Sequence, residues 1–261
     1  MKFRLIDTGY STPSMNMAID EALLASKLPV IRFYRWKPAG LSIGYFQSIK
    51  DFNLKEIKKQ KVGLVRRLTG GNAVLHDKEL TYSFIISEEH MPKSIIESYK
   101  KISNGLMHGL RNLGLKAVMN KDVKKSRKSA VCFNDPSWYE ILIDKKKIVG
   151  SAQKRVDRKL LQHGAVLIDI DVDKYCSLFS NCSKEMVSRV RERMTSINDE
   201  LKRKKEFFPV SYIEAKEALI KGFEEKLSID FIEDKLTEQE KERAKKLDKE
   251  KYSTQGWNLN L

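Results

Sequence analysis

The chain has 261 residues, of which 41% are hydrophobic and 33% charged, and it carries a formal net charge of +15. This length suffices for one large domain with a sizeable core, and the composition excludes an intrinsically disordered chain. The polar N-terminus argues against a secretory signal, and no apolar run approaches the roughly 18 residues of a membrane helix, so we expect a soluble protein.

Helix and strand signals alternate along the first two-thirds of the chain. A helix is predicted over residues 15–24, with Ser14 as its N-cap. Short strands rich in β-branched and aromatic residues follow it. They cover residues 30–35, 41–46, 62–67 and 80–87.

The clearest helix signal begins at Ser94, which forms a capping box with Glu97. Apolar residues then recur at spacings of three and four residues up to Leu113, and Gly114 supplies the stop. We expect the apolar stripe of this helix to pack in the core.

Strands are predicted again over residues 138–143, 147–153 and 165–170, and Asp144-Lys145-Lys146 makes the first two a hairpin. Beyond about residue 172 the chain becomes helical and highly charged. Two further helices open at capping boxes, Ser211 with Glu214 and Thr237 with Glu240.

These signals predict the fold class α+β, with mixed β-sheets flanked by helices. We expect a single domain over residues 1–261, with a core of about residues 1–172 and a helical C-terminal appendage of about residues 173–261. A monomer is the simplest expectation for its oligomeric state.

Cysteine usage limits the chemistry. The three cysteines are Cys132, Cys176 and Cys182, and no two of them form a Cys-x-x-Cys pair. We therefore expect neither a metal site nor a disulfide framework, and a reducing cytoplasm is the natural location.

The surplus of positive charge predicts an acidic partner, which could be nucleic acid, an anionic membrane or a small acidic carrier protein. The lysines are spread along the chain and mostly alternate with acids in its last third. A nucleic-acid-binding module instead gathers basic residues on a reading helix or among stacking aromatics. We expect no nucleic-acid and no membrane partner, and a solvated face explains many single lysines equally well.

A glycine-rich loop is the first candidate binding element. A strand ends in Arg66 and Arg67, turns through Gly70 and Gly71, and resumes as a short strand to His76. Adjacent glycines let the backbone approach a ligand closely, and their amides can face a carbonyl or phosphate oxygen. A tight hairpin turn with an arginine pair on the surface explains the same pattern.

Cys132 is the candidate nucleophile. It follows a stretch that holds five basic residues, and nearby positive charge favours the thiolate, which is the nucleophilic form. The basic residues are Lys121, Lys124, Lys125, Arg127 and Lys128. Cys132 can also be read as a small buried hydrophobe.

Taken together, three groups of residues resemble the lipoate-protein ligase, octanoyltransferase and biotin ligase superfamily. They are Asn16-x-Ala18-x-Asp20-Glu21-Ala22-Leu23-Leu24, Arg66-Arg67-x-Thr69-Gly70-Gly71 with His76, and Lys147-x-x-Gly150-Ser151-Ala152. The resemblance covers about residues 1–170 and continues over residues 237–258. It implies a biotin/lipoate protein ligase type of catalytic domain.

Within the superfamily the chain is most similar to the bacillus-type octanoyltransferases, which move octanoyl from acyl carrier protein to the glycine cleavage H protein. Residues 41–47 carry this likeness, as do residues 76–83, where ATP-dependent ligases typically read His-Asp-Leu-Gly-Asn. The third stretch is Cys132-Phe133-x-x-Pro136-Ser137-Trp138-Tyr139-Glu140, whose cysteine aligns with the acyl-accepting thiol of that family.

The resemblance implies that Cys132 takes octanoyl from octanoyl-acyl carrier protein and passes it to a lysine of a lipoyl domain such as the H protein. No cofactor and no ATP are expected, because the donor thioester is already activated. The basic segment 121–128 then becomes a docking surface for the acidic carrier. Cys176 and Cys182, on a polar helical stretch, receive no role.

Lys147 is expected beside the acyl carbonyl, where an ammonium stabilises an oxyanion or, with a depressed pKa, takes a proton from an amine. An exposed strand-end lysine is the alternative. Further substrate-binding candidates are Arg67, Gly70, Gly71, Gly150 and Ser151. His76 and His163 are expected either in the wall of the site, where His163 could act as a base, or as buried structural histidines.

Two other activities remain open on the same fold. An ATP-dependent lipoate-protein ligase shares the Gly-Gly loop and the lysine, but has no need of a placed cysteine. An amidotransferase would use the cysteine to move octanoyl from the H protein to other lipoyl domains.

Overall fold

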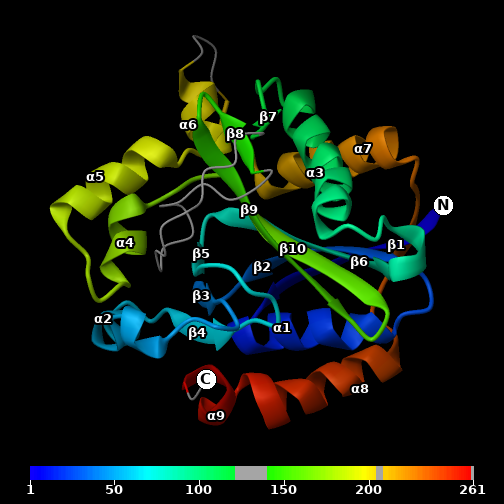
Figure 1. Ribbon diagram of the computed structural model, residues 1–261, viewed down its shortest axis with the longest axis horizontal. Coiled ribbons are helices and arrows are strands. Elements are labelled where there is room, and N and C mark those ends of the chain that lie inside the picture. The colour runs from blue at the N-terminus through cyan, green and yellow to red at the C-terminus, as the bar shows by residue number, and fades with distance from the viewer. Residues whose placement is uncertain (121–139, 204–207, 260–261) are drawn as a thin grey trace.

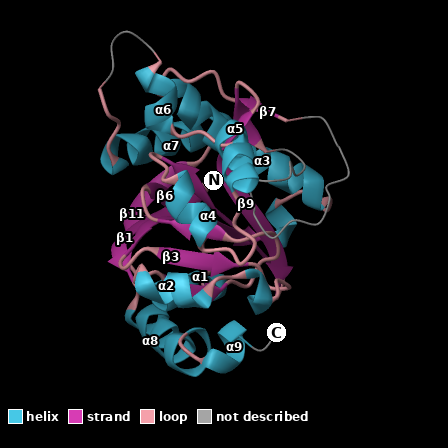
Figure 2. Cartoon of the chain, turned by 90° about the vertical axis from the view of Figure 1, so that its left-hand side faces the viewer, coloured by secondary structure: helices cyan, strands magenta, loops and turns pink. Residues whose placement is uncertain are grey.

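The computed structural model describes residues 1–120, 140–203 and 208–259. Within these ranges the strands form one sheet of eight strands and one of three. Helices cover both faces of the large sheet, and the strands lie between an upper and a lower group of helices (Figures 1 and 2). The predicted α+β class with mixed sheets is confirmed.

The large sheet is mixed, because β1 runs parallel to both of its neighbours while the other adjacent strands are antiparallel. Its strands, in spatial order, are β11 (Asp230–Asp234), β1 (Lys2–Ser11), β2 (Val30–Trp36), β6 (Glu79–Ser87), β10 (Lys159–Leu167), β9 (Lys146–Val156), β8 (Ile141–Ile143) and β7 (Val118–Met119). The small sheet has the order β4 (Gly63–Arg66), β3 (Gly40–Ile43) and β5 (Val74–His76).

The helices pack into three hydrophobic clusters. In chain order they are α1 (Pro13–Ala22), α2 (Leu54–Lys59), α3 (Ile95–Asn112), α4 (Val172–Ser177), α5 (Lys184–Arg193), α6 (Ile197–Lys202), α7 (Tyr212–Leu227), α8 (Glu238–Leu247) and α9 (Gln255–Leu259). Helices α3 and α7 cover one face of the large sheet and α1 covers the other, with α8 packed against α1 on its outer side (Figure 1). Helices α2, α4 and α5 pack with the small sheet.

Strand β2 shows why nearly every residue of a central strand in the large sheet is hydrophobic. Successive side chains of a strand point to opposite faces, so Ile31 and Phe33 join the cluster of α3 and α7, while Val30 and Tyr34 join that of α1. Both faces are buried, which leaves Arg32 fully enclosed and in need of a partner.

Several predicted elements are confirmed with small corrections. The predicted N-cap Ser14 is wrong, because Thr12 caps α1 and accepts a hydrogen bond from the Met15 amide at 3.3 Å. Strand β3 ends at Ile43, before the predicted end, because Gly44 turns the chain against the backbone of Gly71. Ser94 caps α3 by accepting the Glu97 amide, but the reciprocal bond of the predicted capping box is not formed. The capping boxes predicted at Ser211 and Thr237 open α7 and α8.

The β8–β9 hairpin is confirmed, with positive φ at both residues of its turn, Asp144 and Lys145. A second such turn at Asp157 and Arg158 joins β9 to β10, which therefore begins at Lys159 and not at 165. Strand β11 was also not predicted. It lies within the region expected to be helical and extends the sheet beside β1.

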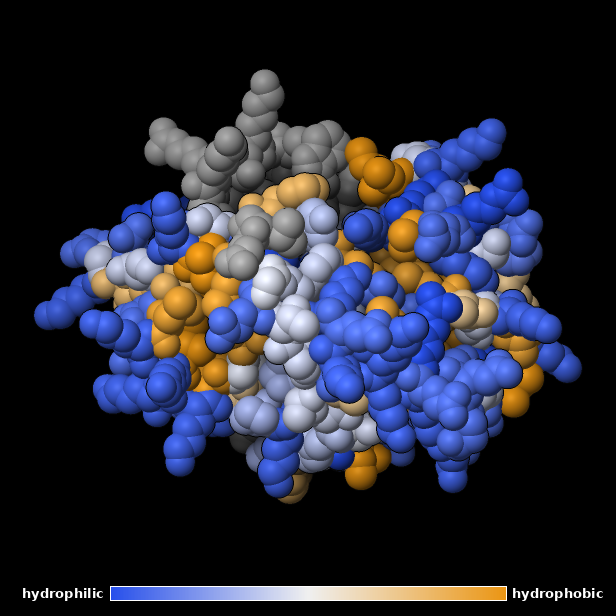
Figure 3. Space-filling model, turned by 90° about the horizontal axis from the view of Figure 1, so that it is seen from below, coloured by the Kyte–Doolittle hydropathy of each residue, from blue (hydrophilic) through white to orange (hydrophobic). Residues whose placement is uncertain are grey.

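The face that carries α8 and α9 is mainly hydrophilic, with hydrophobic areas between the polar side chains (Figure 3). Among the described residues, no helix combines the length and apolarity needed to cross a bilayer.

The contact between α3 and α7 yields a stability prediction. A Cβ on Gly222 would lie 2.3 Å from the backbone nitrogen of Gly109 and 2.5 Å from the carbonyl oxygen of Gly105, and backbone atoms cannot move aside cheaply. We expect Gly222→Ala to lower the free energy of unfolding by about 1–3 kcal/mol, measured by urea denaturation.

The matched control is Gly256→Ala in α9, where a Cβ would have no atom within 4 Å. This change should leave stability the same or raise it by up to about 1 kcal/mol, because alanine has the higher helix propensity. Equal effects of the two substitutions would contradict the close helix contact.

Candidate functional site

A cavity of about 250 Å³ lies between the two sheets, and its walls come from α1, β2, β3, β5, β6, β9 and β10 and from the loops between them. It brings together most of the site residues predicted from the sequence, namely Arg67, Gly71, His76, Lys147, Gly150, Ser151 and His163. Gly70 is not in the wall; its carbonyl accepts a hydrogen bond from Arg67 at 2.7 Å. Cys132 lies outside the described residues.

The floor of the cavity crosses four strands. Tyr34, Thr81, Ala165 and Gly150 are aligned with one another on β2, β6, β10 and β9, and all four line the cavity. Neighbouring strands are about 4.8 Å apart, so this row spans about 14 Å of sheet. Three of its members are small, which leaves a trough that can hold an extended apolar chain. Met17 closes the side of the trough formed by α1.

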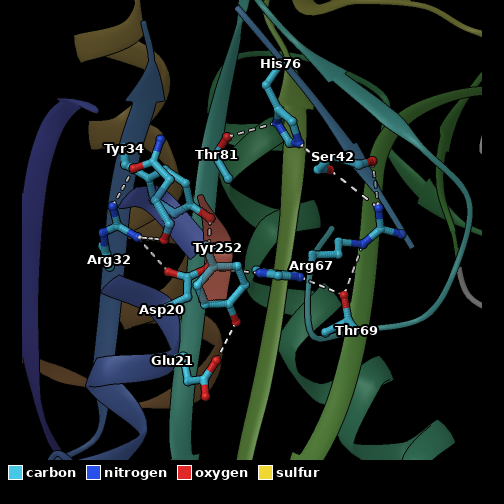
Figure 4. Close-up of polar contacts among 12 residues, drawn as sticks. Asp20, Glu21, Arg32, Tyr34, Ser42, Arg67, Thr69, His76, Thr81 and Tyr252 are labelled. Atoms are coloured by element: carbon cyan, nitrogen blue, oxygen red, sulfur yellow. Dashed lines mark hydrogen bonds and ion pairs between the residues drawn. The ribbon is translucent and has the colours of Figure 1, made fainter. Parts of the chain in front are cut away.

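The Gly-Gly loop is shaped from inside by Arg67. Its guanidinium donates hydrogen bonds to the carbonyls of Ser42 (3.0 Å), Gly70 (2.7 Å) and Asn72 (2.9 Å), and to the hydroxyl of Thr69 (3.1 Å) (Figure 4). The interpretation as a surface arginine pair is wrong, because Arg66 and Arg67 are both buried. These hydrogen bonds hold the loop from the inside of the protein.

Arg66 ties the same region to the end of the chain. Its guanidinium donates to the carbonyls of Gly44, Tyr45 and Gln47 at 2.8–3.0 Å and to that of Asn258 at 3.1 Å. The Asn258 side chain in turn accepts the Arg66 amide at 2.7 Å. Helix α9 is therefore part of the support behind the Gly-Gly loop.

His163 sits in the cavity wall with both ring nitrogens engaged. Nδ1 is 2.9 Å from a carboxylate oxygen of Asp20, and Nε2 is 2.8 Å from the Thr69 hydroxyl. Asp20 also accepts hydrogen bonds from Arg32 at 2.7 Å and from Tyr34 at 2.9 Å. This geometry favours a structural histidine over a free base.

The Asp20 carboxylate stays ionised in this network. Burial by itself would raise its pKa, but the hydrogen bond from His163 and the charge of Arg32 outweigh that effect, so the pKa of Asp20 is lowered. Sequence reasoning placed Asp20 in a family-like motif without a role and missed Arg32, whose partner lies twelve residues earlier on another element.

His76 is likewise held from several sides. Its ring stacks on Trp36 with centroids 4.0 Å apart, Nε2 lies 2.8 Å from the Ser42 hydroxyl, and Nδ1 lies 3.2 Å from Glu79. Burial lowers the pKa of His76 despite the nearby Glu79 carboxylate. The histidine is thus both a cavity wall and a structural residue, which were the two alternatives from the sequence.

Lys147 is buried, so the interpretation as an exposed strand-end lysine is wrong. Its Nζ donates to the carboxylate of Glu140, which is also buried and also lines the cavity. Sequence reasoning gave Glu140 no role. The predicted hairpin does not bring the two side chains together, because it places Glu140 three residues beyond the partner of Lys147; the contact depends on the register shift between Ile141 and Leu142.

The two described cysteines are poor nucleophiles. Burial raises the pKa of Cys176 to about 12 and also raises the pKa of Cys182. Neither residue lines the cavity. This agrees with the expectation that neither takes part in catalysis.

Comparison with known proteins identifies the relatives of this architecture. A family model described as the lipoyl protein ligase A/B catalytic domain matches residues 12–224. The octanoyltransferase LipM of Brevibacillus brevis is 44% identical over an alignment of 277 positions, which covers 99% of this chain and 99% of that protein. The octanoyltransferase LipM of Bacillus subtilis is 43% identical over 279 residues, covering 98% of this chain and 97% of that protein.

Solved structures agree. Lipoate-protein ligase A bound with ATP superposes with a TM-score of 0.82 at 33% identity, covering 99% of this chain and 98% of that one. A bi-partite lipoate protein ligase from Thermoplasma acidophilum, described with its E2 lipoyl domain, gives a TM-score of 0.83 at 31% identity. The superposition covers 99% of this chain and 96% of that one. The resemblance inferred from the motifs is confirmed.

The lowered pKa of His76 predicts a pH dependence of stability. In the unfolded chain this histidine titrates near its ordinary value of about 6.5, whereas the folded protein binds the proton only at lower pH. Between these values the unfolded state binds more protons, so stability falls as the pH drops below about 6.5, by at most about 1.4 kcal/mol per pH unit.

We expect His76→Asn to flatten this dependence in urea titrations between pH 7 and pH 5. The exposed His90 offers the control His90→Asn, which should keep the slope of the wild-type protein. A slope unchanged by His76→Asn would contradict the neutral, buried state of the ring.

Proposed function

Because the chain belongs to the lipoyl protein ligase A/B catalytic-domain family, we propose that it is an octanoyltransferase that loads a lipoyl-domain lysine from octanoyl-acyl carrier protein. The named relatives support octanoyl transfer in lipoate biosynthesis. The donor, the acceptor and the cysteine intermediate are the parts that the proposal adds.

The observation that carries the proposal is the trough across β2, β6, β10 and β9 with the buried Lys147 in its wall. An octanoyl chain is apolar and unbranched, and the small side chains of Thr81, Ala165 and Gly150 leave room for it along the sheet. The Lys147 ammonium can stabilise the oxyanion that forms when the acyl carbonyl is attacked.

Cys132 is proposed, from its sequence context, as the residue that holds the octanoyl group between the two steps. In the first step the thiolate attacks the donor thioester, one C–S bond forms as another breaks, and the proton of Cys132 ends on the released carrier thiol. The exchange of one thioester for another is nearly neutral in free energy and needs no ATP. It lets two protein partners use one site in turn.

In the second step the amine of the acceptor lysine attacks the acyl-cysteine. A C–N bond forms, the C–S bond breaks, and the amide product is more stable than the thioester. The bi-partite ligase described with its E2 lipoyl domain supports a lipoyl domain as acceptor, and the glycine cleavage H protein is the proposed one. A reactive thiol of this kind needs a reducing compartment, and the proposed location is therefore the cytoplasm.

A second candidate is an ATP-dependent lipoate-protein ligase, because the solved structures named above are ligases and one of them binds ATP. Such an enzyme activates a free acid as an acyl-adenylate and needs no acyl-cysteine. The two activities therefore differ in their need for ATP and in a covalent intermediate.

The test is to incubate the protein with octanoyl-acyl carrier protein, without ATP, and to measure its intact mass. We expect the gain of one octanoyl group, labile to hydroxylamine and absent from Cys132→Ala. Lys147→Ala should slow this gain on the order of 100-fold, since it removes the oxyanion partner. Cys182→Ala, at an exposed thiol away from the cavity, is the control and should react normally.

The protein would instead be a ligase if it forms no adduct and modifies a lipoyl domain only when ATP and either octanoate or lipoate are supplied. The protein would be an amidotransferase if the adduct forms from an octanoylated H protein but not from octanoyl-acyl carrier protein.

The basic segment 121–128 supplies a separate prediction, although it lies outside the described residues. Reversing Lys124, Lys125 and Arg127 to Glu should raise KM for octanoyl-acyl carrier protein roughly tenfold, because electrostatic attraction to the acidic carrier is lost. Labelling of Cys132 by a small thiol reagent should not change. Unaltered carrier kinetics would reject this docking surface.

A further inference from the structure

Glu140 and Lys147 form a buried ion pair in the wall of the cavity. Both side chains are almost fully buried, at 2% and 5% exposed, yet both line the cavity. A buried pair costs desolvation of two charges, and apolar replacements of similar volume are often no less stable. Charges kept in the wall of a substrate cavity therefore point to a function there.

The backbone holds both partners in place. Glu140 directly precedes β8 and its carbonyl accepts the Asn120 amide at 2.8 Å, while the Lys147 carbonyl on β9 accepts the Thr195 amide at 3.0 Å. The hairpin turn between them fixes their separation. The backbone of each partner is thus anchored, and the ion pair with Lys147 holds the Glu140 carboxylate in the wall.

The other charges in the wall are cationic or neutral. The titratable and charged side chains that share the cavity with Glu140, among the residues that the structure describes, are Lys147, Arg67, His76, His163 and Tyr34. Burial lowers the pKa of His76 and raises that of Tyr34, which keeps both neutral at pH 7. Within this set Glu140 is the only carboxylate.

The second step of the proposed function brings a further cation to this place. The acceptor lysine carries an ammonium with a pKa near 10.4, so almost all of it arrives protonated at neutral pH. Lys147 and Arg67 repel an ammonium in the cavity, and it cannot attack a thioester until it loses a proton. A carboxylate at this wall attracts the ammonium and can accept that proton.

We propose that Glu140 binds the ammonium group of the acceptor lysine and takes its proton. The inference rests on the proposed function and assigns to Glu140 the amine-dependent step alone. The freed amine then attacks the acyl-cysteine, the C–N bond forms and the C–S bond breaks. The thiolate takes a second proton from the nitrogen, and Glu140 passes the first proton to water as the amide leaves.

The donor, octanoyl-acyl carrier protein, brings no ammonium group that must lose a proton, which makes the two half-reactions separable. Acyl-enzyme formation from octanoyl-acyl carrier protein is read by intact mass, and transfer from isolated acyl-enzyme to a lipoyl domain is read by the mass of that domain. We expect Glu140→Gln to keep the rate of acyl-enzyme formation within about threefold of the wild-type rate. The same change should slow transfer to the lipoyl domain roughly ten- to hundredfold. Raising the pH from 7 to 9 should shrink this deficit, since more acceptor amine is already neutral.

Three comparisons make the result specific. Glu140→Asp keeps a carboxylate and should recover most of the transfer rate. Lys147→Ala should slow the donor step, which Glu140→Gln leaves intact. Glu238→Gln removes an exposed carboxylate that pairs with Lys241 away from the cavity, and it should change neither half-reaction.

An equal loss of both half-reactions in Glu140→Gln, at any pH, would overturn the inference and leave Glu140 as a positioning residue for Lys147. Unchanged transfer to the lipoyl domain would overturn it as well. Failure of the proposed function is a different result, since the wild-type protein would then form no acyl-enzyme at all. Circular dichroism and thermal melting of each variant separate these outcomes from misfolding.

Discussion

The ion pair between Asp20 and Arg32 is the interaction on which the site depends. Both side chains are at most 1% exposed, and a buried charge without its partner costs about 3–5 kcal/mol. Asp20 belongs to α1 and Arg32 to β2, so the pair joins the helix to the central strand. Through His163 the same carboxylate reaches β10, and through Thr69 the chain of contacts ends at Arg67 (Figure 4). One carboxylate therefore sets the positions of three walls of the cavity.

The C-terminal region completes this support from outside. Arg4 of β1 binds Glu240 of α8 and Asp234 of β11, Glu21 of α1 accepts the Tyr252 hydroxyl, and the end of α9 holds Arg66. These contacts join positions more than 190 residues apart in the sequence. The region predicted as an appendage thus packs against the elements that carry the cavity, and the division of the chain into core and appendage stays a prediction.

The sequence predicted the parts of the site whose signal is local. The Gly-Gly loop and the hairpin before Lys147 both follow from residues within a few positions of one another. The burial of Arg67 did not follow, because its partners are backbone carbonyls, which no side-chain pattern reveals. Strand β11 and the Asp20–Arg32 pair depend on distant pairing, and the turn at Asp157 and Arg158 uses positive φ without glycine. The contact of Glu140 with Lys147 did not follow either, since it depends on a register shift between Ile141 and Leu142 that no local pattern reveals.

The central claim is that an octanoyl group on Cys132 lies in the trough with its carbonyl oxygen at Lys147. A crystal structure of the octanoylated protein tests it most directly. We expect continuous density from the Cys132 sulfur into the cavity, over Gly150 and Ala165 toward Tyr34, with the carbonyl oxygen within hydrogen-bond distance of the Lys147 Nζ. Octanoyl density attached elsewhere, or a chain that leaves this cavity empty, would contradict it.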